Sequence, residues 1–232
     1  MLDRAARWAV LAEEELVRRH AHDGFRDFIA HQLETTIHFG RIERVEPLGD
    51  GVRLLVDAGT LGLDDVAVGD SIAIQGACMT VVALADDGFD VDVSRESLSL
   101  TVGLDAPGEV NLEKALTLAD RLGGHLVSGH VDGIGDVVRF EPVGESRLLE
   151  IRVPGELARF FAYKGSVTVD GVSLTVNRVR DEADGTVISI NLIPHTVEVT
   201  TLGRLAPGSR VNLEVDQIAR YVDRILQLRQ VG

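Results

Sequence analysis

The chain has 232 residues, of which 45% are hydrophobic and 26% are charged, and its formal net charge is −14. This is the balance of a globular protein, and no apolar run approaches the roughly 20 residues that span a bilayer, so we expect no membrane association. The negative charge would repel phosphate backbones, which argues against nucleic acid as a partner. The single cysteine, Cys78, can form neither a disulfide within the chain nor a cysteine-rich metal site, as is typical of a reducing compartment.

The first three dozen residues have a helical pattern. Apolar residues recur through residues 3–34 with charged residues between them and without proline, which predicts two short helices. We therefore expect a helical N-terminal extension over residues 1–36. Residues 1–12 mix acidic, basic and apolar side chains and lack a small-residue cleavage site, so they do not read as a secretory signal, and we expect a cytoplasmic location.

From residue 37 onward the apolar period changes to two. Residues 52–56 and 88–93 alternate between apolar and polar side chains, and turn signals stand at 49–51 and 86–88. This pattern predicts short antiparallel strands joined by tight turns.

The strand-rich part of the chain is an internal repeat. Residues 75–81 (QGACMTV) recur about 95 residues later as 170–176 (DGVSLTV), and the VNLE of 110–113 recurs at 211–214 in the same order. Each half has roughly 90 to 100 residues, a size at which short strands close into a small antiparallel barrel. The predicted domains are residues 1–36, 37–124, 125–216 and 217–232.

The last predicted domain is an amphipathic helix that begins after Asp216, which is placed as its N-cap. Apolar side chains form a narrow stripe along it at Ile218, Tyr221, Val222, Ile225 and Leu226. Such a stripe either covers its own barrel or packs against other copies of the chain. We favour self-association.

Several motifs resemble those of one known family. They are the segments 76–81, 95–98, 123–132, 163–165, 192–196 and 200–203. The most specific is the central GGHLVSGHVD of residues 123–132, which looks like the segment between the barrels in the riboflavin synthase family. The resemblance runs from about residue 40 to residue 226.

The resemblance implies an all-β fold of two tandem six-stranded antiparallel barrels of the flavin-binding Greek-key type. It also implies a homotrimer that binds 6,7-dimethyl-8-ribityllumazine and converts two molecules of it to riboflavin and 5-amino-6-(D-ribitylamino)uracil. No metal or other cofactor is implied, and lumazine synthase is a suggested partner protein. A duplicated chain suits this reaction because two identical substrates need two similar pockets.

The reaction removes a proton from a methyl group of one lumazine and adds the resulting carbanion to the other, which requires a base, a nucleophile or oriented water, and hydroxyl groups that hold the rings. By resemblance, the catalytic residues are Cys78, His130, Ser71 and Asp216. By resemblance, the substrate contacts are Thr80, Ser94, Glu96, Ser97, Lys164, Ser173, Thr175, Ile193 and Thr196. Cys78 and Ser173 occupy equivalent positions of the repeat.

Plainer interpretations of these residues stay open. Cys78 could be a small buried hydrophobe, and Thr80 could reflect the ordinary preference of threonine for strands. His130 could cap a backbone carbonyl, and Asp216 could be only a helix cap. His125 is assigned a structural role.

The start of the first barrel departs from the family pattern. Family members usually begin with a Met-Phe-Thr-Gly-Ile-Val type of segment, whereas residues 37–42 read IHFGRI. Aligning Gly40 with Gly129 places Arg41 opposite His130 in the repeat. A second function is therefore kept beside the enzyme, that of a non-catalytic lumazine or flavin carrier such as the lumazine and yellow fluorescent proteins of this fold.

Overall fold

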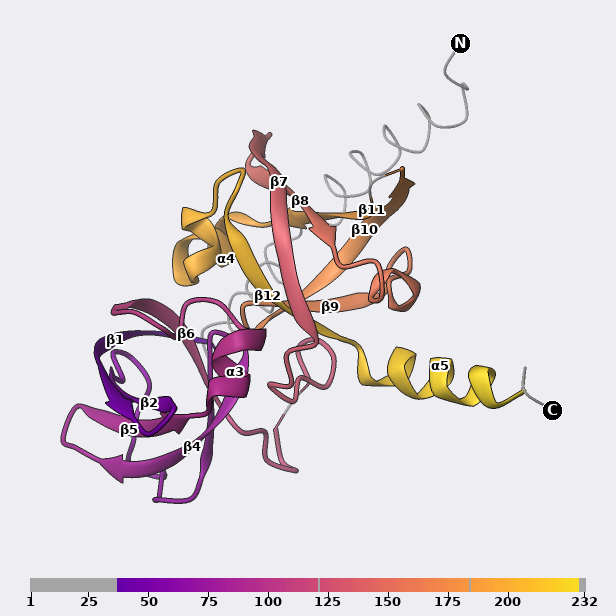
Figure 1. Cartoon of the computed structure of the whole chain (residues 1–232). Helices are drawn as coiled ribbons and strands as arrows, with labels where there is room; N and C mark the ends of the chain where they lie inside the picture. The colour runs from indigo at the N-terminus through magenta and orange to yellow at the C-terminus, as the bar shows by residue number, and fades with distance from the viewer. Residues whose placement is uncertain (1–36, 121, 184, 230–232) are drawn as a thin grey trace, which may run out of the picture.

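The computed structural model describes residues 37–120, 122–183 and 185–229, and within them the chain forms two closed antiparallel barrels in tandem (Figure 1). The first barrel has the neighbour order β1-β2-β5-β4-β3-β6. Its strands are β1 (His38–Leu48), β2 (Gly51–Asp57), β3 (Ser71–Ile74), β4 (Ala77–Leu84), β5 (Gly88–Val93) and β6 (Gly108–Lys114). The predicted helical extension over residues 1–36 lies outside the described residues.

The second barrel repeats this arrangement, with the neighbour order β10-β11-β8-β7-β12-β9. Its strands are β7 (Gly133–Val143), β8 (Ser146–Val153), β9 (Ser166–Val169), β10 (Val172–Glu182), β11 (Gly185–Leu192) and β12 (Arg210–Val215). The short helices are α3 (Arg95–Leu100), α4 (Pro194–Val199) and the 3-10 turns η1 (Ala158–Phe160) and η2 (Thr201–Arg204). The predicted fold class of two six-stranded barrels is confirmed.

Period-two alternation closes each barrel around its own core. In β3, Ile72 and Ile74 are fully buried, whereas Ser71 and Ala73, which alternate with them, point outward and are only half-buried. In the second barrel, Val167 and Val169 play the same part. Burying such branched apolar side chains stabilises the fold by about 1.5 to 3 kcal/mol each, whereas the outward positions are left for polar chemistry.

Strand register corrects the alignment of the repeat at its first strand. Gly40 of β1 pairs with Val110 of β6, and Gly135 of β7 pairs with Val211 of β12. Because Val110 and Val211 begin the two VNLE motifs, Gly40 corresponds to Gly135 and not to Gly129. The prediction that Arg41 stands opposite His130 is therefore wrong. The error arose because the glycine-rich segment of residues 123–135 offers several glycines for the alignment, and Gly129 was chosen in place of Gly135.

The two barrels meet at a pair of equivalent two-residue hairpin turns. Gln75 and Asp170 have φ values of 50° and 48°, and they are followed by Gly76 and Gly171 at 82° and 86°. A Cβ atom on Gly76 would lie 2.6 Å from the backbone nitrogen of Gly171. The two turns therefore touch backbone to backbone, which only glycine allows.

Two equivalent asparagines cross this joint in opposite directions. Asn111 of β6 donates from Nδ2 to the Asp170 carbonyl (2.8 Å), and Asn212 of β12 donates from Nδ2 to the Gln75 carbonyl (2.9 Å). Their side-chain oxygens accept from Thr201 N–H and Val102 N–H, at 2.9 and 2.8 Å. Both asparagines are nearly fully buried, so the joint depends on these reciprocal bonds being satisfied.

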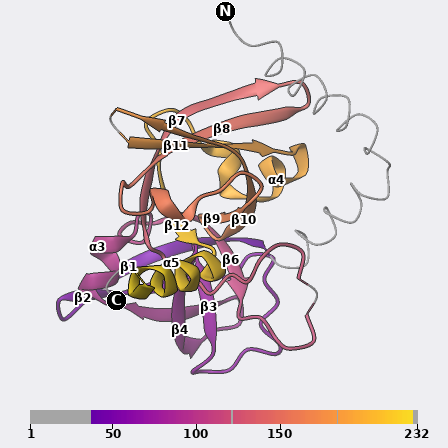
Figure 2. The same ribbon diagram turned by 90° about the vertical axis from the view of Figure 1, so that its right-hand side faces the viewer.

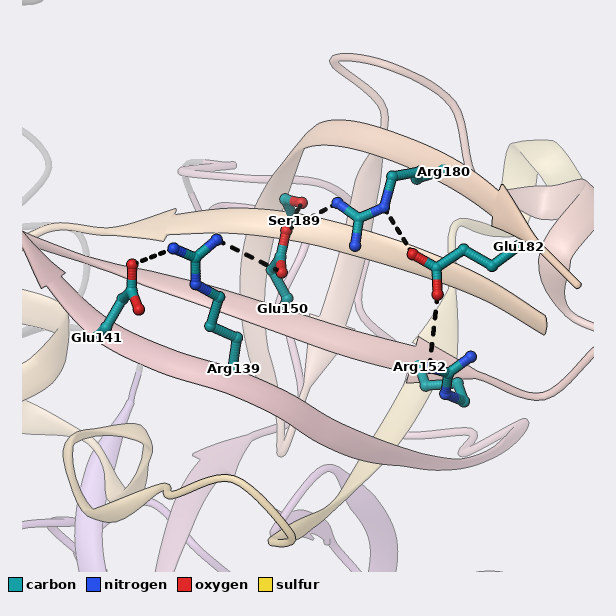
Figure 3. Close-up of polar contacts among 7 residues, drawn as sticks. All are labelled: Arg139, Glu141, Glu150, Arg152, Arg180, Glu182 and Ser189. Carbon is teal, nitrogen blue, oxygen red and sulfur yellow. Dashed lines mark hydrogen bonds and ion pairs between the residues drawn. The ribbon is translucent and has the colours of Figure 1, made fainter. Parts of the chain in front are cut away.

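The outer face of the second barrel carries a network of ion pairs centred on Glu150 of β8 (Figure 3). The Glu150 carboxylate accepts from Arg180 Nη1 (3.1 Å) and from the Ser189 hydroxyl (2.9 Å), and Arg139 Nη1 lies 3.9 Å away. The network continues through Glu141, Glu182 and Arg152. Desolvation acts to raise the pKa of Glu150, but the hydrogen bonds from Arg180 and Ser189 outweigh it and hold the pKa below its usual value.

The C-terminal helix α5 (Gln217–Arg229) projects from the junction of the barrels (Figures 1 and 2). Its apolar side chains are about half exposed or more. These side chains are Ile218, Tyr221, Val222, Ile225, Leu226 and Leu228. The predicted amphipathic helix is confirmed. Its apolar stripe covers neither barrel. No helix among the described residues has the length and apolar character needed to cross a membrane.

Candidate active site

A row of three side chains crosses the outer face of the first barrel. Glu113 of β6 pairs with Ala73 of β3, and Ala73 pairs with Cys78 of β4. Directly opposed residues of neighbouring strands project to the same face, so these three side chains lie side by side. Ser71 and Thr80, which oppose each other two residues along, extend the same polar surface.

The second barrel carries the equivalent row. Glu214 of β12 pairs with Thr168 of β9, and Thr168 pairs with Ser173 of β10. Ser166 and Thr175 oppose each other as Ser71 and Thr80 do in the first barrel. The repeat therefore presents two sets of similar polar groups, and Cys78 and Ser173 are its equivalent members, as predicted from the sequence.

The segment between the barrels runs across the first row. Cys78 N–H donates to the Gly129 carbonyl (2.7 Å), and a Cβ atom on Gly129 would lie 2.8 Å from that of Cys78. The Glu214 carboxylate accepts from Ser128 N–H (2.9 Å) and Gly129 N–H (3.0 Å). A carboxylate of the second barrel thus holds this segment against the cysteine of the first.

The same segment reaches the second row through His125. Its Nδ1 lies 2.9 Å from the Ser173 hydroxyl, and its Nε2 lies 3.2 Å from that of Thr168. Burial lowers the pKa of His125 in spite of the opposing charges of Asp216 and Glu214, which favours a neutral ring that accepts one hydrogen bond and donates the other. Sequence reasoning gave His125 a structural role and did not place it beside Ser173. The repeated Gly-His pair in the central motif was the available signal.

The cavity beside Cys78 is small. It has a volume of about 40 Å³, and its lining includes Ser71, Cys78, Glu113 and Ser128. A larger hollow of about 280 Å³ lies where Arg204 of η2 meets Glu109 of β6, and no predicted site residue lines it. We take the smaller cavity as the functional one because it collects the thiol, the hydroxyl and the carboxyl groups.

Comparison with known proteins identifies the family. The lumazine binding domain model matches residues 37–115 and 128–216, one match for each barrel. The chain is 43% identical to riboflavin synthase of Photobacterium phosphoreum over 81% of this chain and 85% of that protein. It is 44% identical to riboflavin synthase of Mycobacterium tuberculosis (strain H37Rv) over 81% and 94% of the two chains. This chain belongs to the riboflavin synthase family.

Solved structures share the fold of this family member. A crystal structure of LumP complexed with 6,7-dimethyl-8-(1'-D-ribityl) lumazine aligns with a TM-score of 0.67 at 23% identity, over 77% of this chain and 95% of that one. LumP complexed with riboflavin aligns with a TM-score of 0.66 at 25% identity over the same shares. These likenesses support the tandem-barrel architecture.

The other residues predicted in the first barrel lie at the start of α3. The Ser94 hydroxyl accepts from Ser97 N–H at 3.1 Å, and their hydroxyls are also 3.1 Å apart. Ser94 is thus the N-cap of α3, and Glu96 in its first turn is exposed. Capping engages one acceptor of Ser94 and leaves its remaining hydrogen-bonding capacity for a ligand.

In the second barrel, Ile193 and Thr196 correspond to Ser94 and Ser97. Ile193 stands at the N-cap position of α4 without a side-chain cap bond, and Thr196 is buried. Lys164, in the turn before β9, has a φ of 62° and reaches Asn177 Oδ1 at 3.2 Å.

The two remaining residues predicted as catalytic are His130 and Asp216. His130 is exposed, and it follows the Gly129 that contacts Cys78. Asp216 Oδ1 accepts from Ile218 N–H at 2.9 Å, so Asp216 does cap α5. It also acts electrostatically on His125, so a role at the second row remains compatible with capping. Among the described residues, no cluster of three or more His, Cys, Asp or Glu side chains could hold a metal ion.

Proposed function

We propose that this chain is a riboflavin synthase that transfers a four-carbon unit between two molecules of 6,7-dimethyl-8-ribityllumazine, giving riboflavin and 5-amino-6-(D-ribitylamino)uracil. The observation that supports this most is the duplicated row of polar groups, with Cys78 in one barrel and Ser173 in the other. The identity of 43% and 44% to riboflavin synthases over most of both chains points the same way.

The proposed chemistry divides between the two rows. The reaction begins when a base takes a proton from the 7-methyl group of one lumazine, and the carbanion then adds to the ring of the other. His125 beside Ser173 can orient the Ser173 hydroxyl, and the Cys78 thiol beside Ser71 can add to a ring or hold water against it. We propose that the catalytic residues are Cys78, His130, Ser71 and Asp216. We propose that the substrate contacts are Thr80, Ser94, Glu96, Ser97, Lys164, Ser173, Thr175, Ile193 and Thr196.

The reaction itself is the test of this proposal. Incubating the pure full chain with the lumazine alone should produce riboflavin absorbance and an equal amount of the uracil product. A protein that binds the lumazine and yields no riboflavin over hours would instead be a carrier of the LumP kind. The departure of residues 37–42 from the usual family start is the observation that favours this second candidate.

Lys164 offers a variant that removes a proposed substrate contact without damaging the fold. Its equivalent in the first barrel is Gly69, at a φ of 101°, so a glycine is accepted at this turn. We expect Lys164→Gly to lower kcat/KM about tenfold through loss of one charge-assisted contact, equivalent to ~1.4 kcal/mol. Chemical denaturation should show stability unchanged or raised, since glycine relieves the left-handed strain. Unaltered kinetics would remove Lys164 from the site.

We also propose that the chain is a homotrimer assembled through α5. Its stripe includes Ile225, which is 55% exposed in the single chain. Ile225→Asp should convert the trimer to monomers, because a charge in an apolar interface is costly to bury. Arg224→Gln changes the net charge by the same amount on the same helix and should leave the trimer intact. Analytical ultracentrifugation distinguishes the two, and a wild-type monomer would contradict the proposal.

We propose a cytoplasmic location, since the only cysteine is an unpaired thiol, and lumazine synthase as a partner protein. We also propose that the chain divides into the domains 1–36, 37–124, 125–216 and 217–232.

A further inference from the structure

Glu113 supplies the only carboxyl group among the described residues that line the cavity beside Cys78. It stands in the same cross-strand row as the cysteine, with Ala73 between them. Alanine leaves open the space that Thr168 fills in the second barrel. The carboxyl therefore faces a cavity where its repeat equivalent faces protein.

The two equivalent glutamates differ in their partners. Glu214 accepts two backbone hydrogen bonds, from Ser128 and Gly129. The Glu113 side chain makes no hydrogen bond within the part of the chain that the structure describes. Burial and the charge of Glu214 are the causes that shift its pKa there. Glu113 is only partly buried and its carboxyl oxygens keep contact with solvent, so a ligand in the cavity would replace water as the partner of this carboxyl group.

We propose that Glu113 is a further ligand-binding residue of the first-barrel site, whose carboxyl group donates a hydrogen bond to a carbonyl oxygen or acceptor nitrogen of the bound heterocycle. The proposal rests on the proposed function, because the ligand is the lumazine of that reaction. Lumazine presents such acceptors along the edge of its ring. Ser71 and Cys78 line the same cavity as Glu113 and could contact the same ring.

The protonation state of Glu113 suits this role. Burial, and secondly the charge of Glu214, raise its pKa to about 8, so at pH 7 the group is mostly protonated and can donate. Binding through the acid form is strong below that pKa and weakens about tenfold for each pH unit above it. The other ionisable groups facing the cavity are the Cys78 thiol and Lys114, whose ammonium group pairs with Asp65.

Cys78 provides a local readout because it is the only cysteine in the chain. Its alkylation rate, measured on the full chain against increasing 6,7-dimethyl-8-ribityllumazine, gives the ligand concentration that protects it by half. For the wild type this concentration should rise about tenfold between pH 7 and pH 9. Glu113→Gln keeps a donor that does not titrate, so it should bind about as well at pH 7 and lose this dependence.

Three comparisons make the test decisive. Titration of the ligand, of Cys78 or of Lys114 would affect the wild type and Glu113→Gln alike, so the difference between their pH profiles isolates Glu113. Glu113→Ala should raise the half-protecting concentration about tenfold at pH 7, through loss of one hydrogen bond. Glu43→Gln, on the exposed surface of β1, should match the wild type throughout.

The outcomes separate the two proposals. Protection of Cys78 with the same pH profile in the wild type, Glu113→Gln and Glu113→Ala would overturn the role of Glu113 and leave the proposed function standing. Absence of protection in the wild type at any lumazine concentration would overturn the proposed function itself, and with it the role of Glu113. Circular dichroism of each variant establishes that the comparison is between folded proteins.

Discussion

Replacing Gly76 with alanine should lower the free energy of unfolding by ~4 kcal/mol, the largest loss that we expect from a single methyl group in this protein. The new Cβ atom would lie 2.6 Å from the Gly171 nitrogen, and the obstructing atom is backbone of the opposite barrel. Neither turn can yield, because Gln75 and Asp170 on both sides are tied to Asn212 and Asn111. The left-handed φ of 82° adds ~1 to 2 kcal/mol of strain.

Gly208 provides the matched control for this substitution. It has a φ of 91°, and a Cβ atom added there would meet nothing within 4 Å. Gly208→Ala should therefore show the conformational strain alone, ~1 to 2 kcal/mol. The midpoints of urea unfolding measure both variants, and equal losses at Gly76 and Gly208 would mean that the contact between the turns contributes nothing.

Replacing Glu150 with alanine should cost ~2 to 3 kcal/mol. The substitution leaves the Ser189 hydroxyl without its acceptor and the guanidinium groups of Arg139 and Arg180 without their shared anion (Figure 3). The loss falls below the full cost of breaking a buried pair because both arginines are a third to a half exposed and can turn to water. Glu141→Gln, at the exposed end of the same network, should cost less than ~0.5 kcal/mol.

The effect of Glu150 should also depend on pH in a defined direction. The pKa of Glu150 is held below its usual value in the folded state, so its stabilising contribution is present above the unfolded pKa of about 4 and is lost as the pH falls through the folded one. The difference in unfolding free energy between the wild type and Glu150→Gln should therefore shrink below pH 4. A difference that stays constant from pH 7 to pH 3 would show that Glu150 acts through packing and not through its charge.

The internal repeat does not predict the side chain at the position of Glu150. Its equivalent in the first barrel is Leu55, since Arg44 pairs with Leu55 as Arg139 pairs with Glu150. Both positions face outward on a strand, and such positions can hold either an apolar or a charged side chain at little cost to the core. The ion-pair network was therefore not predictable from the barrel pattern.

The candidate site was predictable in part. The equivalence of Cys78 and Ser173 followed from the repeated loop, whereas Ser71 and Thr80 were assigned from the resemblance to the family. The contacts of His125 and the exposure of Glu113 to a cavity were missed, because both depend on how the central segment crosses the barrels. Local pattern contains no information on that path, since the segment is neither helix nor strand.

Sequence by itself determined that the chain is a duplication of short strands with a helix at its end, because apolar period and recurrence are properties of neighbouring residues. Only the tertiary structure decided which glycines correspond, how Asn111 and Asn212 join the barrels, and which of two equivalent glutamates faces a cavity. These depend on groups up to 137 residues apart, as between Gln75 and Asn212, and such groups meet only after both barrels close. Closure is driven by the buried apolar faces, which leave the outward polar positions free to differ between the two halves.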